Sequence, residues 1–108
     1  AARYDELFKD ANCVTPFIAA GSTSVYAQYT LMVDDREGLI KHLNSVGVPT
    51  AVHYPIPLHK QPIFTHNYHG QDLSVSEKTA AKVVSLPMHS YLDHATQDTI
   101  VAAVKQFI

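Results

Sequence analysis

Two histidines bracket a proline-rich segment, "HYPIPLH", at residues 53–59. His53 is followed directly by Tyr54, and His59 closes the segment. A neutral imidazole is a common metal ligand, and it can also donate to or accept from a phosphate, a sugar hydroxyl or a carboxylate. Three interpretations are open: a metal site, a substrate contact, or a packed tyrosine beside a solvated histidine. Residue types alone favour the third interpretation.

A zinc site would have to draw on the seven histidines of the chain, which are His42, His53, His59, His66, His69, His89 and His94. If the prolines hold the segment in a polyproline conformation, a rise of ~3.1 Å per residue separates the Cα atoms of His53 and His59 by roughly 19 Å. Nitrogens that share one zinc ion must each lie ~2 Å from it. The single cysteine cannot complete a thiolate site. We therefore predict no metal site, with a His-rich metal-binding domain as an alternative.

Composition predicts one small globular domain over residues 1–108, with 46% hydrophobic and 17% charged residues. The net charge of -2, with two arginines and no Lys/Arg cluster, argues against nucleic acid as a partner. No apolar run approaches the ~18 residues that span a bilayer, and the lone Cys13 fits a reducing compartment. We expect a soluble cytoplasmic protein without a membrane partner. The opening "AARYDELF", in helical rhythm and without Met, predicts a segment of a longer polypeptide.

Hydrophobic periodicity predicts the first elements. Apolar side chains recur at helical spacing through residues 2–11, at Tyr4, Leu7, Phe8 and Ala11. The stretch "SVYAQYTLMV", residues 24–33, is rich in β-branched and aromatic residues and predicts a strand. Gln28 and Tyr29 lie on opposite faces of that strand. We expect Tyr29 to pack in the core, and the role of Gln28 stays open.

A helix is predicted over residues 34–47, because Asp34 and Glu37 have capping-box spacing and Gly47 stands at the expected stop. The following "PTAVHY", residues 49–54, predicts a short strand. Residues 24–54 would then form a strand, helix, strand unit. His53 and Tyr54 would lie at the C-terminal end of its last strand, where α/β proteins often bind ligands.

The second half of the chain begins with a long proline-containing loop, residues 55–73. Ser74 and Glu77 repeat the capping-box spacing before a helix through about Val84, and "SLPMH" predicts a short extended piece. A last helix begins between residues 93 and 96. The expected fold is a small α/β domain of two layers, with about three strands and helices on one side.

Three stretches carry a family resemblance: "SVYAQYTLMV", "LIKHLNSVGVPTAVHYPIPLHKQPIF" and "AAKVVSLPMHSYL". In this order they resemble the C-terminal part of the DegT/StrS-type sugar aminotransferases, and the resemblance covers nearly the whole chain. The "VYAQY" form is similar to that of enzymes that aminate UDP-linked 3-keto sugars. By this resemblance the chain is the small C-terminal domain of a fold-type I enzyme.

The resemblance implies a dimeric enzyme that uses pyridoxal 5'-phosphate, takes the amino group from glutamate and serves bacterial cell-surface polysaccharide biosynthesis, including O-antigen. The lysine that holds the cofactor and the residues that bind its phosphate belong to the large domain, before Ala1. The lysines present here, Lys9, Lys41, Lys60, Lys78, Lys82 and Lys105, do not match the motif of the cofactor lysine. We therefore expect these 108 residues alone not to transaminate.

The resemblance also implies that the small domain contacts the nucleotide sugar. His53 and Tyr54 become the leading substrate-contact residues, with His59 and Gln28 as weaker ones. The prolines of the segment would fix its backbone and reduce the ordering cost of binding. The alternative is a non-catalytic interaction module that associates through the apolar face of residues 2–11.

Overall fold

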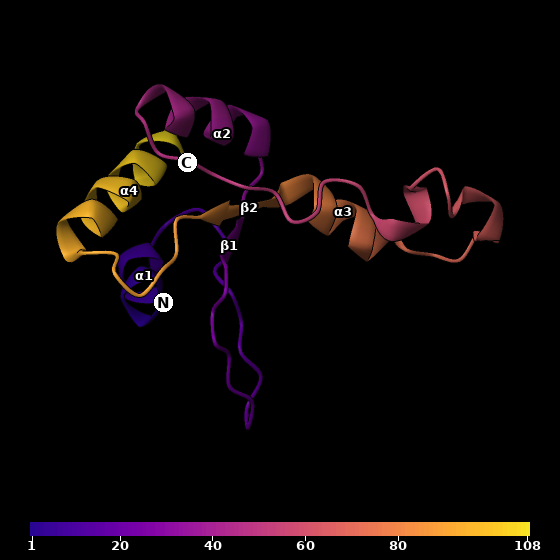
Figure 1. Cartoon of the computed structure of the whole chain (residues 1–108), viewed down its shortest axis with the longest axis horizontal. Helices are drawn as coiled ribbons and strands as arrows, with labels where there is room; N and C mark the ends of the chain where they lie inside the picture. The colour runs from indigo at the N-terminus through magenta and orange to yellow at the C-terminus, as the bar shows by residue number, and fades with distance from the viewer.

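The computed structural model describes the backbone of all 108 residues and every side chain except that of Thr65. The elements in chain order are α1 (Ala2–Phe8), β1 (Tyr29–Met32), α2 (Arg36–Ser45), the 3-10 turns η1 (Leu58–Lys60) and η2 (Thr65–Asn67), α3 (Ser74–Lys82), β2 (Val83–Leu86) and α4 (His94–Phe107). In Figure 1 the strands lie at the centre, with α1, α2 and α4 grouped on one side and α3 on the other.

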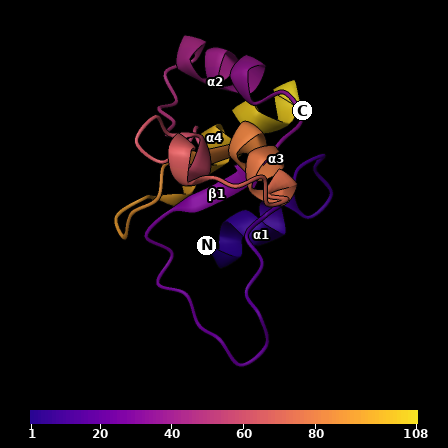
Figure 2. The same cartoon turned by 90° about the vertical axis from the view of Figure 1, so that its right-hand side faces the viewer.

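Two segments project from this body. One is the chain that leads into β1, and the other carries η1 and η2 (Figures 1 and 2). The Cα radius of gyration is 15.5 Å, whereas a compact domain of 100 residues has about 13 Å. The projections account for this difference, and the second of them carries part of the site described below.

The sheet is antiparallel, with Tyr29 paired to Leu86 and Met32 to Val83. A single residue pairs with the outer edge of each strand: Val14 with Met32 of β1, and Ala51 with Ser85 of β2. The sheet therefore has two strands and not the three that the sequence predicted. The predicted strand 49–54 pairs through Ala51 alone; Pro49 at its start and Pro55 directly after it have no N–H to donate to a strand ladder.

The expected strand, helix, strand connection takes a split form. Both β1 and Ala51 run antiparallel to β2, on its two sides, so they are parallel to each other with β2 between them. Helix α2 connects them, as in split βαβ units. β2 is therefore the central strand, and all four of its residues are buried.

The core lies between one face of this sheet and the helices α1, α2 and α4. Tyr29 is fully buried, and its ring centroid lies 4.7 Å from that of Tyr4 on α1. The Tyr4 hydroxyl donates to the Pro87 carbonyl at 3.0 Å, and burial raises the pKa of this phenol to about 12. The largest fully buried side chains are Tyr4, Tyr29, Phe8, Leu31, Leu39, Leu43, Val84 and Val104. The predicted core roles of Tyr4, Phe8 and Tyr29 are confirmed.

Helix starts and stops agree with the sequence at some ends and differ at others. The cap of α2 is Asp35, whose carboxylate accepts from the Gly38 amide at 2.9 Å. The predicted cap, Asp34, instead pairs with Lys82 at 2.6 Å. The stop is as predicted: Gly47 follows α2 with a φ of +78°. Helix α4 begins at His94 under an Asp93 cap, within the predicted window.

Helix α3 begins at Ser74, as the sequence predicted, but its predicted cap and its predicted end are wrong. Ser74 does not cap the helix, because Leu73 occupies the cap position and Glu77 is engaged with the loop that precedes the helix. The helix ends at Lys82 and not at Val84, because Val83 and Val84 enter the central strand. β-branched residues that pack on both faces of a sheet favour this outcome over one more helical turn.

Candidate functional site

The sheet face opposite the helical core carries two hollows. The first cavity, of about 570 Å³, lies between residues 53–61 and the α3–β2 junction. Its walls include His53, Tyr54 and Leu58 on one side and Ser76, Thr79 and Val83 on the other. This volume is within the range of small-molecule sites, ~300–1,000 Å³. The wall combines apolar surface with hydroxyl and imidazole groups that can orient a polar ligand.

The second cavity, of about 290 Å³, adjoins the first at His53. It is lined by Gln28 from the segment before β1, and by Ser85 of β2. Thr50 and Ala51, from the segment that pairs with β2 through Ala51, also line it. His53 lines both cavities, so the two hollows meet at this residue. The structure therefore brings together three of the four residues that the sequence singled out: His53, Tyr54 and Gln28.

His53 and Tyr54 are both exposed at the mouth of the first cavity. Tyr54 is 75% exposed, which contradicts the interpretation of a packed tyrosine. Its ring meets that of His53 edge-on, with centroids 5.9 Å apart. Two neighbouring side chains with polar tips can contact a ligand while their rings support each other.

The fourth residue, His59, lies apart from this group. Its Nε2 is 3.0 Å from Oε1 of Glu77 on α3, and Tyr68 packs against its ring at a centroid distance of 5.0 Å. The His59 side chain is only 10% exposed. It lines a neighbouring hollow, the loop cavity of about 370 Å³, and not the first or second cavity.

Ser85 is a site residue that sequence reasoning missed. It is 5% exposed, lies in the central strand and shares a hydrogen bond of 2.8 Å between its hydroxyl and that of Thr30. The signal was a serine within the otherwise apolar run "VVSL". A polar residue buried in a central strand requires a partner, and here the partner is a hydroxyl on the opposing strand.

The seven histidines do not gather into a metal centre. Among the described side chains, no three of His, Cys, Asp or Glu lie close enough together to hold one ion. Of the helices in the structure, α4 is the longest with 14 residues, and none combines the length and apolarity that a membrane span requires.

Comparison with known proteins gives the family. Residues 1–105 match the DegT/DnrJ/EryC1/StrS aminotransferase family. The chain is 50% identical over 104 residues to the UDP-2-acetamido-2-deoxy-3-oxo-D-glucuronate aminotransferase of Pseudomonas aeruginosa, which covers 96% of this chain and 28% of that protein. It is 36% identical to a pleiotropic regulatory protein of Geobacillus stearothermophilus, over 99% of this chain and 30% of that one.

Solved structures agree with this assignment. A DegT DnrJ EryC1 StrS aminotransferase from Brucella abortus superposes with a TM-score of 0.89 at 38% identity, covering 98% of this chain and 28% of that one. The structure of S. venezuelae DesV in complex with a ketimine intermediate gives a TM-score of 0.90 at 26% identity, over 97% and 29% of the two chains. The chain thus spans a little over a quarter of the length of these relatives. Since the family match covers all but the last three residues, the chain belongs to the DegT/DnrJ/EryC1/StrS aminotransferase family.

Proposed function

We propose that this chain is the small C-terminal domain of a pyridoxal-phosphate-dependent aminotransferase that aminates a nucleotide-linked keto sugar, a UDP-linked 3-keto sugar in particular. The observation that carries the proposal is the 50% identity over 104 residues to an aminotransferase named for a UDP-linked 3-oxo sugar acid. The aligned region takes in 96% of this chain, so the relative supports the substrate class, and we propose that the two cavities supply the contact surface.

The proposed substrate contacts are His53, Tyr54 and Gln28, with His59 as the weakest of the four. His53 and Gln28 line the second cavity, and His53 and Tyr54 line the first. Imidazole, phenol and amide groups can each donate to and accept from sugar hydroxyls, and each can donate to phosphate oxygens. His59 ranks last because its Nε2 already bonds Glu77.

The cofactor does not fit the residues described here. Among the described residues, no lysine lines the first cavity, the second cavity or the loop cavity. Lys60 and Lys82 instead pair with Glu77 and Asp34 at the surface. When bound, pyridoxal phosphate supplies the electron sink of an aminotransferase. We therefore assign the cofactor site to a part of the protein outside this chain and expect the 108 residues alone to be inactive.

The finer features of the proposal follow the family. Glutamate is the amino donor, the complete protein is a cytoplasmic homodimer, and the product enters bacterial cell-surface polysaccharide biosynthesis. These features concern the complete protein, of which this chain provides the side that meets the sugar nucleotide.

The test is the visible absorption spectrum of the complete protein that contains these residues, before and after glutamate is added. The proposal predicts a cofactor band that shifts on amino transfer from glutamate and returns when a UDP-linked 3-keto sugar is added. A complete protein that stays colourless with added pyridoxal phosphate would contradict it, and a non-catalytic interaction module would then be the better account.

A further inference from the structure

The wall of the first cavity is formed in part by a short stretch of irregular chain, residues 54–61, which we call the cavity loop. Leu58 from this loop and Ser76 from α3 line both the first cavity and the loop cavity behind it. The loop is therefore a thin partition between two hollows. Its own backbone bonds are local ones, from Lys60 to Pro57 and from Gln61 to Leu58, and they do not hold it against α3.

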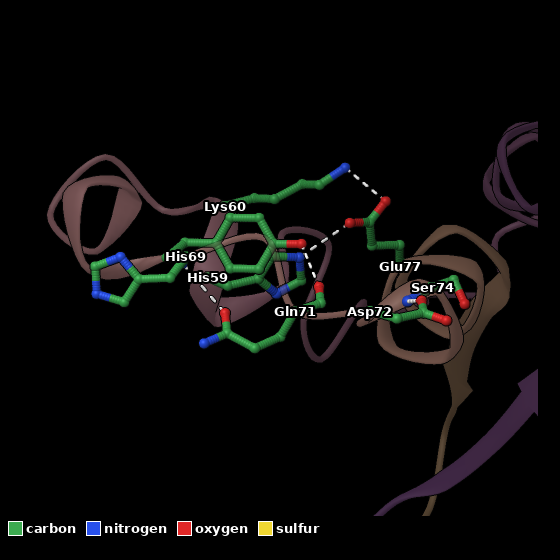
Figure 3. A network of polar contacts seen from close by, with 8 residues as sticks. His59, Lys60, His69, Gln71, Asp72, Ser74 and Glu77 are labelled. Carbon is green, nitrogen blue, oxygen red and sulfur yellow. Dashed lines mark hydrogen bonds and ion pairs between the residues drawn. The ribbon is translucent and has the colours of Figure 1, made fainter.

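One carboxylate joins the cavity loop to α3. Glu77 accepts from His59 Nε2 on Oε1, at 3.0 Å, and from Lys60 Nζ on Oε2, at 2.6 Å. Figure 3 shows both side chains reaching from the loop toward this single residue. Among the described side chains, these are the hydrogen bonds that connect residues 54–61 to α3. With one donor on each oxygen, the carboxylate fixes the direction as well as the position of the loop.

The surroundings of Glu77 keep it in the form that accepts both bonds. Its hydrogen bond to Lys60, and then that to His59, hold the pKa of this carboxyl below its usual range. Glu77 is therefore ionised at neutral pH. His59 is shielded from water, since Tyr68 packs over its ring. Tyr68 is held in turn by the bond that its hydroxyl donates to the Gln71 carbonyl.

We propose that Glu77 is a positioning residue for the substrate cavity: it holds the cavity loop against α3 through His59 and Lys60, and so sets the place of Tyr54 and Leu58 in the cavity wall. This role rests on the proposed function, because it serves the binding of the sugar nucleotide. Glu77 itself lines none of the three cavities, that is, the first, the second or the loop cavity. Its effect should therefore fall on substrate affinity and leave the reaction with glutamate unchanged.

The experiment compares Glu77→Ala, Glu77→Gln and the control Glu6→Ala in the complete protein. Glu6 is an exposed helical glutamate on α1, far from the loop in sequence and without a described side-chain bond. For Glu77→Ala we expect a rise of roughly tenfold in KM for the UDP-linked 3-keto sugar, the size of effect that loss of charge-assisted bonds produces. We expect kcat, and the rate of the cofactor band shift with glutamate, to stay within about twofold.

Glu77→Gln keeps the shape of the side chain and can accept from only one of the two donors, so its KM should fall between those of wild type and Glu77→Ala. If Glu77 served only to fill space, this variant would match wild type. Glu6→Ala should leave KM unchanged. A Glu77→Ala protein with the wild-type KM would overturn the proposal.

Amide hydrogen exchange gives a readout that does not depend on activity. In Glu77→Ala the amides of Lys60 and Gln61 should exchange faster than in wild type, while those of β2 keep their rates. Unchanged exchange across residues 54–61 would also overturn the positioning role. A wild-type protein that fails to transaminate would count against the proposed function, and the exchange comparison would still decide whether Glu77 holds the loop.

Discussion

The two faces of the β1–β2 sheet differ in what covers them. On one face Leu31 and Val84 are fully buried under α1, α2 and α4. On the other, Thr30 and Ser85 bond each other beside the cavities, and the loop that closes this side is fastened by the His59, Lys60 and Glu77 contacts. The first face is stabilised by area removed from water, and the second by a few directional polar bonds.

This difference places the candidate site in the part of the molecule with the smaller share of the packing energy. Several large apolar side chains of the loop side remain exposed, with Ile63 at 68% and Tyr54 at 75%. Regions with few buried apolar contacts open more readily than the core does. The polar contacts of Glu77 with His59 and Lys60 therefore matter more for the place of this loop than apolar packing does.

The largest expected effect is a difference in unfolding free energy between a truncation on the packed face and one on the loop side. Leu31→Ala should lower the free energy of unfolding by about 2–5 kcal/mol, because it leaves a cavity in a fully buried position. Ile63→Ala, at an exposed position on the loop side, should change it by no more than about 0.5 kcal/mol. Urea denaturation measures both, and equal losses would contradict the division into a packed face and a polar one.

A smaller effect is expected at the start of α4, a helix of the packed face. Asp93 accepts from the Thr96 amide at 2.9 Å, and Asp93→Ala should cost about 1 kcal/mol of unfolding free energy. Asp10→Ala provides the same substitution at an exposed position after α1 where the structure describes no side-chain bond. If both variants unfold at the same urea concentration, the cap does not stabilise the packed face.

The smallest effect concerns acid pH. Hydrogen bonds from Thr96 hold the pKa of Asp93 below its ordinary value, and Lys82 does the same for Asp34. A carboxyl with a lowered folded pKa is protonated first in the unfolded state as the pH falls. Its contribution is therefore present above about pH 4, the ordinary value, and is lost as the pH falls through the lowered one.

Asp93→Asn sharpens this test because asparagine also caps helices. The variant should match wild type near pH 7 and should lose less stability than wild type as the pH falls below about 4, the ordinary value. Urea unfolding across this pH range measures both slopes. If the unfolding free energies of the two proteins fall in parallel with pH, Asp93 does not contribute to the acid sensitivity of the domain.

The sequence predicted the packed face better than the loop side, and the reason is physical. Periodic burial is visible in local sequence, so Tyr4 and Phe8 identified α1, and Leu39 and Leu43 recur on the buried face of α2. The start of β2 was missed because Val83 and Val84 continue a helical pattern locally and become a strand only through pairing with β1. Such tertiary pairing overrides local propensity.

The site was only partly predictable for the same reason. Proline spacing and the His-Tyr pair drew attention to residues 53–59, and the structure places His53 and Tyr54 at one cavity. The engagement of Glu77 with His59 and Lys60 was not predicted, since the spacing from Ser74 suggested a capping box. Which of several partners a carboxylate takes depends on chain segments that are distant in sequence.

The measurement that tests the central claim most directly is the steady-state kinetics of His53→Ala and Tyr54→Phe in the complete protein, with a UDP-linked 3-keto sugar as the acceptor. Loss of a hydrogen bond to the substrate should raise KM by roughly three- to tenfold in each variant. The absorption band of the cofactor and its shift with glutamate should stay as in wild type. Wild-type KM values in both variants would contradict the assignment of this surface to the sugar nucleotide.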